Sequence, residues 1–381
     1  MNGFKRKDSF LLKLGMTAVV LLFTQHAFAA GTTAGTDVDN LATVDYEVNG
    51  NNQEDIESAP GAGNSVPGVG NGTVTTFEVD NRVDFTLTQI GAAHTVVSPG
   101  DSDAFVEFLL TNNGNSAQDF RMAFTQLGSG DGAVNTLVDT DDDMANVRIR
   151  VGNGGGVPVL GDLEYADELA EDASVTVYVF ADADVVLGLV NGDIANLELS
   201  ATVAAAGTAA SLGADLVDDV GNADDPAAVD VVFADGGGGL GDGVEADRDG
   251  FEVQSAGLNV TKVATVIDDP FNGTTNPKAI PGATVEYVIT IANGGTLDAD
   301  NVSISDSIDT DVTFIADFYA GQDLAVVNDG TTITPCNADG GDADTDGCAL
   351  DGQDLTVGNA NLAITVVAGT TLTVTYRVTI P

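Results

Sequence analysis

The sequence predicts an all-β protein built from two β-sandwiches in tandem, and three observations support this fold class. Short runs of alternating apolar and polar residues recur along the chain, separated by clusters of Gly, Pro, Asn and Asp. The 381 residues include 46 glycines and no tryptophan, and no long apolar pattern with a helical period follows the N-terminal segment. Segments of the first half recur in the second half, which indicates a duplicated β unit.

Residues 1–29 have the layout of a secretory signal peptide. A Lys-Arg-Lys run at 5–7 precedes an apolar stretch at 14–23, and Ala-Phe-Ala at 27–29 matches an A-x-A cleavage site. The apolar stretch has about ten residues, whereas a bilayer span needs about twenty. We therefore expect cleavage rather than an uncleaved anchor. The mature chain is expected outside the cell or at its surface, without a transmembrane segment.

Removal of residues 1–29 leaves a very acidic chain. Four of the 12 bases and one of the 59 acids lie in that segment, so the mature chain has 8 bases, 58 acids and a net charge of −50. Nucleic acids and anionic membrane surfaces are bound through clusters of Lys and Arg, so this charge excludes both as partners. Two roles of the acidity stay open: a surface that remains solvated at high salt, or carboxylates that bind Ca²⁺.

The first sandwich is expected over residues 31–250, with acidic insertions rich in Gly and Asp. Its opening strands are predicted at 42–48 and 74–89, on either side of a long Gly- and Asn-rich loop, and are expected to pair. The insertion at 213–250 contains the spacing G-x-G-x-x-G at 236–241. It does not predict a nucleotide site, because it lacks a strand–helix context and a lysine, and its acidic flanks would repel phosphate.

The second sandwich is expected over residues 251–381, on the basis of two repeated segments. "VSPGDSDAFVEFLLTNNGN" at 97–115 and "AIPGATVEYVITIANGG" at 279–295 share Pro-Gly, a half-acidic apolar strand and Asn-Gly. "DASVTVYVFAD" at 172–182 recurs as "GTTLTVTYRVTI" at 369–380. Two copies of one β unit explain both repeats, and short strands separated by turn residues are typical of β-sandwiches.

Residues 257–381 carry a resemblance to a known family. The matching pieces, in order, are "NVTKVAT", "IPGATVEYVITIANGG", "ADNVSISDSI" and "TLTVTYRVTI". Together they resemble the domain-of-unknown-function-eleven repeat family of bacterial and archaeal surface proteins. The first copy matches more loosely because of its Asp-rich insertions, and "AGTDVDNLATVDYEV" is similar to N-terminal regions of proteins with this repeat. The resemblance implies an immunoglobulin-like β-sandwich that is extracellular or wall-associated and has no shared active site.

The two cysteines predict a disulfide. Cys336 and Cys348 are twelve residues apart in a chain that is expected to be exported, where disulfides form and persist. The bond would close the loop "CNADGGDADTDGC" and stabilise the fold by about 3 kcal/mol on the chain-entropy estimate. Free thiols or an intermolecular bond are the alternatives. Zinc binding is not expected, because no second Cys pair or nearby His is present.

Inside this loop lies the spacing D-x-D-x-D-G, formed by Asp342, Asp344, Asp346 and a glycine. Alternate Asp oxygens followed by Gly are the first half of a calcium-binding loop, so calcium is the one cofactor that the sequence suggests. Gln353 stands where such loops have a bidentate Glu, and a solvated acidic turn is the alternative. Asp residues at 139, 141 and 143 repeat the alternate spacing without the glycine.

No catalytic set emerges from the sequence. His94 is the one histidine after residue 29, no G-x-S-x-G elbow accompanies it, and we expect it to face solvent in a loop. We therefore expect no enzyme. A secreted hydrolase or carbohydrate-binding module remains the rival class, although the lack of Trp counts against a sugar-binding platform.

The sequence thus favours a secreted, non-enzymatic structural or adhesive protein of the bacterial cell surface or extracellular matrix. Its expected partners are other surface or matrix molecules, or further copies of itself, since no lipobox cysteine or sorting tail is visible. The strand at 370–381 alternates regularly and is expected to pair within its own sandwich, because its apolar face needs burial. A filament subunit that donates this strand to a neighbour is the alternative.

Overall fold

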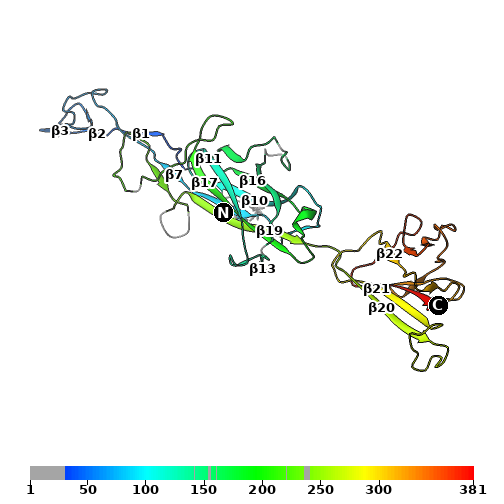
Figure 1. Ribbon diagram of the computed structural model, residues 1–381. Helices are drawn as coiled ribbons and strands as arrows, with labels where there is room; N and C mark the ends of the chain where they lie inside the picture. Colours follow the sequence, from blue (N-terminus) through cyan, green and yellow to red (C-terminus); the bar gives the residue numbers. More distant parts are fainter. Residues whose placement is uncertain (1–30, 141, 153–155, 160, 220, 236–240) are drawn as a thin grey trace, which may run out of the picture.

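The computed structural model describes residues 31–140, 142–152, 156–159, 161–219, 221–235 and 241–381 (Figure 1). The predicted signal peptide, Asp141 and most of the 236–241 glycine segment lie outside these ranges. The described residues form strands and one short 3₁₀ helix, η1 (Val185–Leu187). Within the described ranges, no helix is long and apolar enough to cross a membrane. The predicted all-β class is confirmed.

The first sandwich consists of two facing sheets. Their strands are β8 (Phe85–Gln89), β9 (Thr95–Val97), β10 (Ala104–Asn112), β11 (Gln118–Gln126), β14 (Ala145–Val151), β15 (Tyr165–Leu169), β16 (Ser174–Asp182), β17 (Ile194–Ala205) and β19 (Val244–Val253). One sheet has the order β14-β16-β10-β8, and the other has the order β15-β11-β17-β19-β9. Two short ladders accompany them: β7 (Asn81–Val83) with β18 (Val231–Phe233), and β12 (Ala133–Val134) with β13 (Leu137–Val138).

The second sandwich has a large and a small sheet. Its strands are β20 (Leu258–Asp268), β21 (Thr284–Asn293), β22 (Ile304–Ser307), β23 (Thr313–Phe314), β24 (Ala325–Asn328), β25 (Thr331–Ile333), β26 (Cys348–Asp351), β27 (Asp354–Val357) and β28 (Thr371–Thr379). The large sheet has the order β20-β21-β28-β24-β25, with β23 also paired to β28, and the small sheet has the order β22-β27-β26.

The C-terminal strand β28 pairs within its own sandwich, as predicted. It lies between β21 and β24 in the large sheet, and Leu372, Val374 and Val378 on its inward face are fully buried. Because this strand occupies the middle of its sheet, donation of β28 to a neighbouring molecule is not the arrangement of this structure.

A separate N-terminal module precedes the first sandwich (Figure 1). It consists of three nested ladders: β1 (Asp37–Asn40) with β6 (Thr75–Glu78), β2 (Thr43–Val44) with β5 (Ile56–Glu57), and β3 (Glu47–Val48) with β4 (Asn51–Asn52). The predicted pairing of 42–48 with 74–89 is wrong, because residues 37–40 take that place. Residues 37–78 are all described, and Glu57 is the one buried side chain among them. The module therefore has no hydrophobic core.

A buried asparagine holds the corner after β10 in the first sandwich. The Nδ2 of Asn112 donates hydrogen bonds to the carbonyl oxygens of Ser116 and Leu169, both at 2.9 Å. Its Oδ1 accepts a hydrogen bond from the Gly114 N–H at 3.0 Å. The side chain is 1% exposed, so it satisfies backbone groups that would otherwise be buried without partners.

The second sandwich repeats this corner after β21. The Nδ2 of Asn293 donates to the carbonyl oxygens of Leu297 and Val366, both at 2.9 Å, and its Oδ1 accepts from the Gly295 N–H at 3.1 Å. Asn293 is likewise 1% exposed. Asn112 and Asn293 are therefore structurally equivalent.

The register of the flanking strands agrees with this equivalence. Thr111 lies opposite Ser174 in the β10–β16 pair, and Ala292 lies opposite Thr371 in the β21–β28 pair. Each pair of residues stands next to the corner asparagine in its own copy. The internal duplication that the sequence predicts is confirmed at the level of hydrogen bonds and strand register.

Each sandwich has its own hydrophobic core, and the border between them lies at 254–257. The first core includes Phe108, Phe120 and Phe251, and the second includes Val374 and Tyr376. The border is a few residues later than the one expected near residue 250. Strand β19 continues to Val253 because its last residues pair with β17 and β9.

One side chain links the two sandwiches across this border. The Oδ1 of Asn191 accepts hydrogen bonds from the backbone N–H of Ser255 at 3.0 Å and of Thr296 at 3.3 Å. The Thr296 hydroxyl donates to the same oxygen at 2.5 Å. The asparagine belongs to the loop between η1 and β17, so it ties the first sandwich to both the linker and the second sandwich.

Candidate functional site

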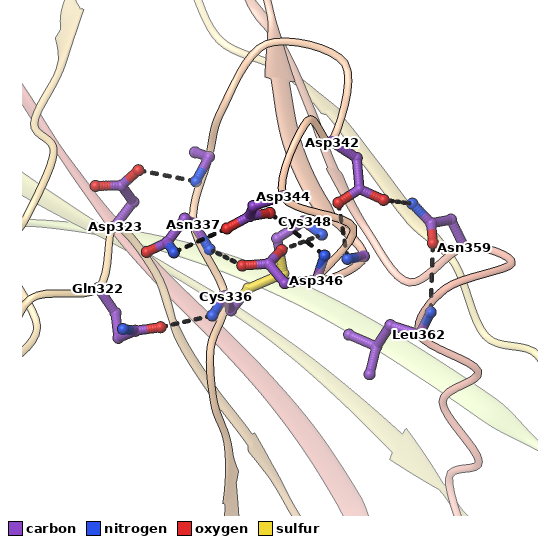
Figure 2. Close-up of a disulfide and its surroundings, with 12 residues drawn as sticks. Gln322, Asp323, Cys336, Asn337, Asp342, Asp344, Asp346, Cys348, Asn359 and Leu362 are labelled. Carbon is purple, nitrogen blue, oxygen red and sulfur yellow. Dashed lines mark hydrogen bonds between the residues drawn. A yellow bond between two sulfur atoms is a disulfide. The ribbon is translucent and has the colours of Figure 1, made fainter.

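The predicted disulfide between Cys336 and Cys348 is confirmed (Figure 2). The two Cα atoms are 5.3 Å apart, and both residues are fully buried within the second core. Cys348 begins β26, while the Cys336 N–H donates to the Gln322 side chain at 2.6 Å. The bond thereby fixes both ends of an acidic loop to the small sheet and its neighbours.

The acidic loop brings together a different set of aspartates from the predicted one. Oxygen atoms of Asp339, Asp342 and Asp344 lie within 4.8 Å of one another. Asp346 is not part of this group: its carboxylate accepts the N–H groups of Asn337 at 2.7 Å and Cys348 at 2.9 Å. Burial raises the pKa of Asp346. Figure 2 shows this carboxylate directed toward the disulfide.

Hydrogen bonds within the loop account for much of the converging group. The Asp342 carboxylate accepts from the side-chain amides of Asn359 and Asn361, both at 2.8 Å, and from the Gly347 N–H at 2.9 Å. These donors lower the pKa of Asp342. The carboxylate of Asp339 accepts two further backbone N–H groups from the turn. The three carboxylates could hold a hard cation such as Ca²⁺, and they also close the turn. Calcium binding stays a prediction.

Two further observations concern aspartates outside this loop. Asp139 is 2% exposed and accepts the Asn196 N–H at 2.6 Å, whereas Asp143 is exposed. Asp141 lies outside the described residues, so the alternate-Asp set stays a prediction. A second group of converging carboxylates was not visible in the sequence. It joins residues far apart along the chain: Asp80, Asp224 and Asp230.

The expected solvent-facing position of His94 is wrong, because the residue is 7% exposed. Its Nε2 lies 2.6 Å from the Asn196 Oδ1, beside the buried Asp249. Gly250 makes the room, since a Cβ there would lie 2.9 Å from the imidazole Cδ2. The hydrogen-bond partner of the ring is an amide rather than a hydroxyl, so this is not a Ser-His-Asp arrangement.

This polar cluster lies beneath the β12–β13 hairpin. The Asn135 side chain donates to Asp249 at 3.3 Å and exchanges hydrogen bonds with the Gln89 side chain at 2.8 and 3.1 Å. Burial raises the pKa of Asp249 to about 6. These hydrogen bonds hold the hairpin against the first sandwich. A glycine inside an otherwise regular strand, Gly250, was the one sequence signal that could have indicated it.

An aromatic and basic hollow lies on the outer face of β16. Phe105, Phe180, Arg148 and Arg150 line it together with residues 157–159, and its volume is about 530 Å³. Arg148 pairs with Asp103 and with Asp182 at 3.5 Å, while Arg150 pairs with Glu164 at 2.6 Å. Phe180 is only 7% exposed. The ring is therefore not a flat platform, and the guanidinium groups already have carboxylate partners.

The solved structures that resemble this chain and are named below are remote likenesses. No protein-family model and no curated protein matches this chain. A solved membrane-anchored protein from Corynebacterium diphtheriae is 12% identical, with a TM-score of 0.19, over 92% of this chain and 89% of that one. The Enterococcus faecalis MSCRAMM ACE, which binds its ligands by the collagen Hug Model, is 12% identical, with a TM-score of 0.17, over 78% and 82%.

An enzyme is among the similar structures as well. AvmM, which catalyses macrocyclization in alchivemycin A biosynthesis, is 11% identical, with a TM-score of 0.20, over 46% of this chain and 91% of that one. Likenesses at this level carry no argument about function. The class of this protein, two tandem β-sandwiches, rests on its own strands and cores.

Proposed function

We propose that this chain is a secreted, non-enzymatic structural protein of the bacterial cell surface or extracellular matrix. The observation that carries the proposal is the duplicated sandwich: two copies with separate cores are joined by a four-residue linker. Asn191 of the first sandwich bonds to both the linker and the second sandwich. Tandem modules with short, fixed links suit a spacer or scaffold. The signal-peptide layout and the resemblance to surface repeats support the same role.

The charge distribution supports a solvated scaffold rather than a binder of anionic polymers. Seven bases of the described chain form ion pairs with carboxylates: Arg82, Arg121, Arg148, Arg150, Arg248, Lys262 and Arg377. A net charge of −50 then remains largely uncompensated at the surface. Such a surface stays hydrated and resists nonspecific association.

Imaging tests the proposed location. A tagged full-length chain, expressed in its producing cells, should be found at the surface or in the surrounding matrix of intact cells. A matched version without residues 1–29 should remain inside. Retention of the full-length chain in the cytoplasm would contradict the proposal.

Calcium uptake by the disulfide-closed loop has its own test. Calorimetry with Ca²⁺ on the mature chain should give a binding heat that is lost in Asp344→Ala, because Asp344 belongs to the converging group. Asp351→Asn, outside that group, is the matched control and should keep the heat. Equal titration curves for the wild type and Asp344→Ala would contradict calcium binding by this loop and favour the alternative, a solvated acidic turn.

The hollow beside β16 is the place to test the rival class, a carbohydrate-binding module, because aromatic rings and polar groups meet there although Phe180 is mostly buried and both arginines are paired. A glycan screen with the mature chain and with Phe105→Ala distinguishes the carbohydrate-binding module from the scaffold. A hit that disappears in Phe105→Ala would favour the carbohydrate-binding module, whereas no hit would favour the scaffold.

A further inference from the structure

A second hollow lies on the outer face of the large sheet in the second sandwich. Arg377 of β28 points outward there, because its neighbours Tyr376 and Val378 are buried in the core, and Glu286 of β21 lies opposite it. The volume of the hollow is about 480 Å³, within the usual range of small-ligand sites. We call it the β20 hollow, and the side chains that line it include Asp268, Thr274, Thr284, Glu286, Phe318 and Arg377.

An ion pair with a defined geometry forms one part of the β20 hollow. The Glu286 Oε2 accepts hydrogen bonds from the Arg377 Nε at 2.8 Å and from the Tyr319 hydroxyl at 3.1 Å, and the Arg377 Nη2 lies 2.7 Å from the same oxygen. All three donors use Oε2, so the other carboxylate oxygen, Oε1, keeps its capacity to accept. Because the carboxylate is already held in place, it can accept a hydrogen bond from a ligand hydroxyl without reorganising.

An aromatic ring forms the adjoining wall. The guanidinium carbon of Arg377 lies 3.6 Å from the centroid of the Phe318 ring, and the Tyr319 ring meets Phe318 edge-on at 5.8 Å between centroids. Phe318 is nevertheless 42% exposed, whereas Phe180 in the hollow beside β16 is 7% exposed. Since the guanidinium covers one face of the Phe318 ring, the exposed part lies away from it, where a ligand can stack.

The turn that carries Phe318 is closed by hydrogen bonds. The Ile315 N–H donates to the Arg377 carbonyl at 3.0 Å, which fixes the start of the turn to β28. Backbone hydrogen bonds at 2.9 and 3.1 Å join Tyr319 and Gln322 in both directions. The ring is therefore positioned before a ligand arrives, and binding costs little conformational entropy on this side.

The opposite wall comes from the end of β20 and the start of β21. Val266 lies opposite Val285 and Asp268 lies opposite Thr284, so Ile267 is the extra residue of a β-bulge. A bulge changes the direction of the side chains that follow it, and here it brings the exposed Asp268 to the β20 hollow. A second carboxylate and a hydroxyl thus face the ring and the ion pair.

We propose that the β20 hollow binds a neutral sugar residue of an oligosaccharide. The carboxylates of Glu286 and Asp268 accept hydrogen bonds from its hydroxyls, and its apolar C–H face stacks on Phe318. An anionic ligand would be repelled by the carboxylates, and a cationic ligand stacked on the ring would be repelled by Arg377 behind it. This inference goes beyond the structural role proposed above and does not depend on the cellular location of the protein.

Binding of defined probes to the mature chain tests the proposal. The probes are immobilised neutral tetrasaccharides of glucose, galactose, mannose and N-acetylglucosamine, with heparin and polylysine as charged probes, in biolayer interferometry. The wild type should bind at least one neutral tetrasaccharide. Phe318→Ala should weaken this binding by roughly tenfold or more, because the stacking surface is lost. Phe318→Tyr keeps the ring and should bind like the wild type, and Asp268→Asn should weaken binding because it replaces a charged acceptor.

The matched control is Phe271→Ala, which removes an exposed phenylalanine from the loop after β20 without altering the β20 hollow. Phe271 is 85% exposed and is not among the lining residues, so this variant should bind like the wild type. Circular dichroism of each variant checks folding. The proposal would be overturned by a wild type that binds no neutral tetrasaccharide or only a charged probe, or by equal losses in Phe271→Ala and Phe318→Ala. A loss in Phe105→Ala with unchanged binding in Phe318→Ala would instead assign the sugar to the hollow beside β16. None of these results alters the location found by imaging.

Discussion

At the scale of single residues, two buried aspartates show how hydrogen-bond donors decide the ionisation of a carboxylate. Asp269 accepts the N–H groups of Phe271, Asn272 and Lys278, and these donors lower its pKa. Asp249 has fewer donors, and burial raises its pKa to about 6. Both side chains are under 5% exposed. The number of N–H groups around the charge, rather than burial alone, sets the direction of the shift.

We expect the first sandwich to lose stability as the pH rises from about 4 to 6. The raised pKa of Asp249 means that the folded state holds a proton there that the unfolded state has released, so folding is favoured below this window. The free energy of unfolding should fall by about 2–3 kcal/mol over this window, at about 1.36 kcal/mol per pKa unit. Asp249→Asn should remove this pH dependence and stabilise the sandwich at pH 7. Hydrogen exchange of the β17 and β19 amides, followed across this pH range, measures the change in the stability of the first sandwich.

The control for this experiment is Asp45→Asn, which removes an exposed carboxylate from the N-terminal module. Its pH profile should follow the wild type. If the stability of Asp249→Asn fell with pH between about 4 and 6 as steeply as that of the wild type, the buried carboxylate would not be the cause of the pH dependence.

At the scale of strands, the sequence predicted what depends on local period and missed what depends on distant partners. Strands β10, β21 and β28 were predictable because alternating side chains mark a half-buried strand. The run at 42–48 has the same alternation, yet it packs on no second layer, since alternation shows which face could be buried but not whether a partner covers it. His94 and Asp249 are 155 positions apart along the chain, so their common cluster left no local signal.

The disulfide loop shows the same division. Cys336 and Cys348 were predictable from their number and spacing in an exported chain. The aspartates that converge were only partly predictable: Asp346 turns toward backbone N–H groups, and Asp339 replaces it in the group. A change of one turn in an irregular loop redirects a carboxylate, and no sequence period records such a change.

Deletion of residues 370–381 should unfold the second sandwich and leave the first folded. Strand β28 buries Leu372, Val374, Tyr376 and Val378, each at 1% exposure or less. At about 1.5–3 kcal/mol per large side chain, the loss of all four is comparable with the net stability of a typical domain. Hydrogen exchange of β21 and β24 provides the measurement.

A matched deletion of residues 31–48 should leave both sandwiches folded, because that segment contributes no buried side chain. A second sandwich that kept its protection without β28 would contradict the central role of this strand.

At the scale of the whole molecule, one side-chain oxygen, together with backbone hydrogen bonds of the linker, joins the two sandwiches. Three donors from Ser255 and Thr296 converge on the Asn191 Oδ1, while the linker itself is only residues 254–257. The cores are separate, so the joint can loosen without unfolding either sandwich.

We expect Asn191→Ala to widen the distribution of angles between the sandwiches. The stability of each sandwich should change by less than about 0.5 kcal/mol, since the lost hydrogen bonds lie at the joint and outside both cores. Spin-label distance measurements between the sandwiches detect the widening, and calorimetry detects the stability. Asn222→Ala, in an exposed loop of the first sandwich, is the control and should leave the distances unchanged. An unaltered distance distribution in Asn191→Ala would show that the linker alone fixes the joint.

The strand order of the second sandwich also decides how it bears a mechanical load. Strands β20 and β28 run in the same direction on either side of β21, with Leu258 beside Asn293 and Thr379 at the far end, beside Thr284. A pull applied at Leu258 and Thr379 therefore acts along the strands in opposite directions. The hydrogen bonds between these strands lie across the pull and are sheared together, instead of opening one after another. We therefore expect the second sandwich to resist tension applied between these two residues.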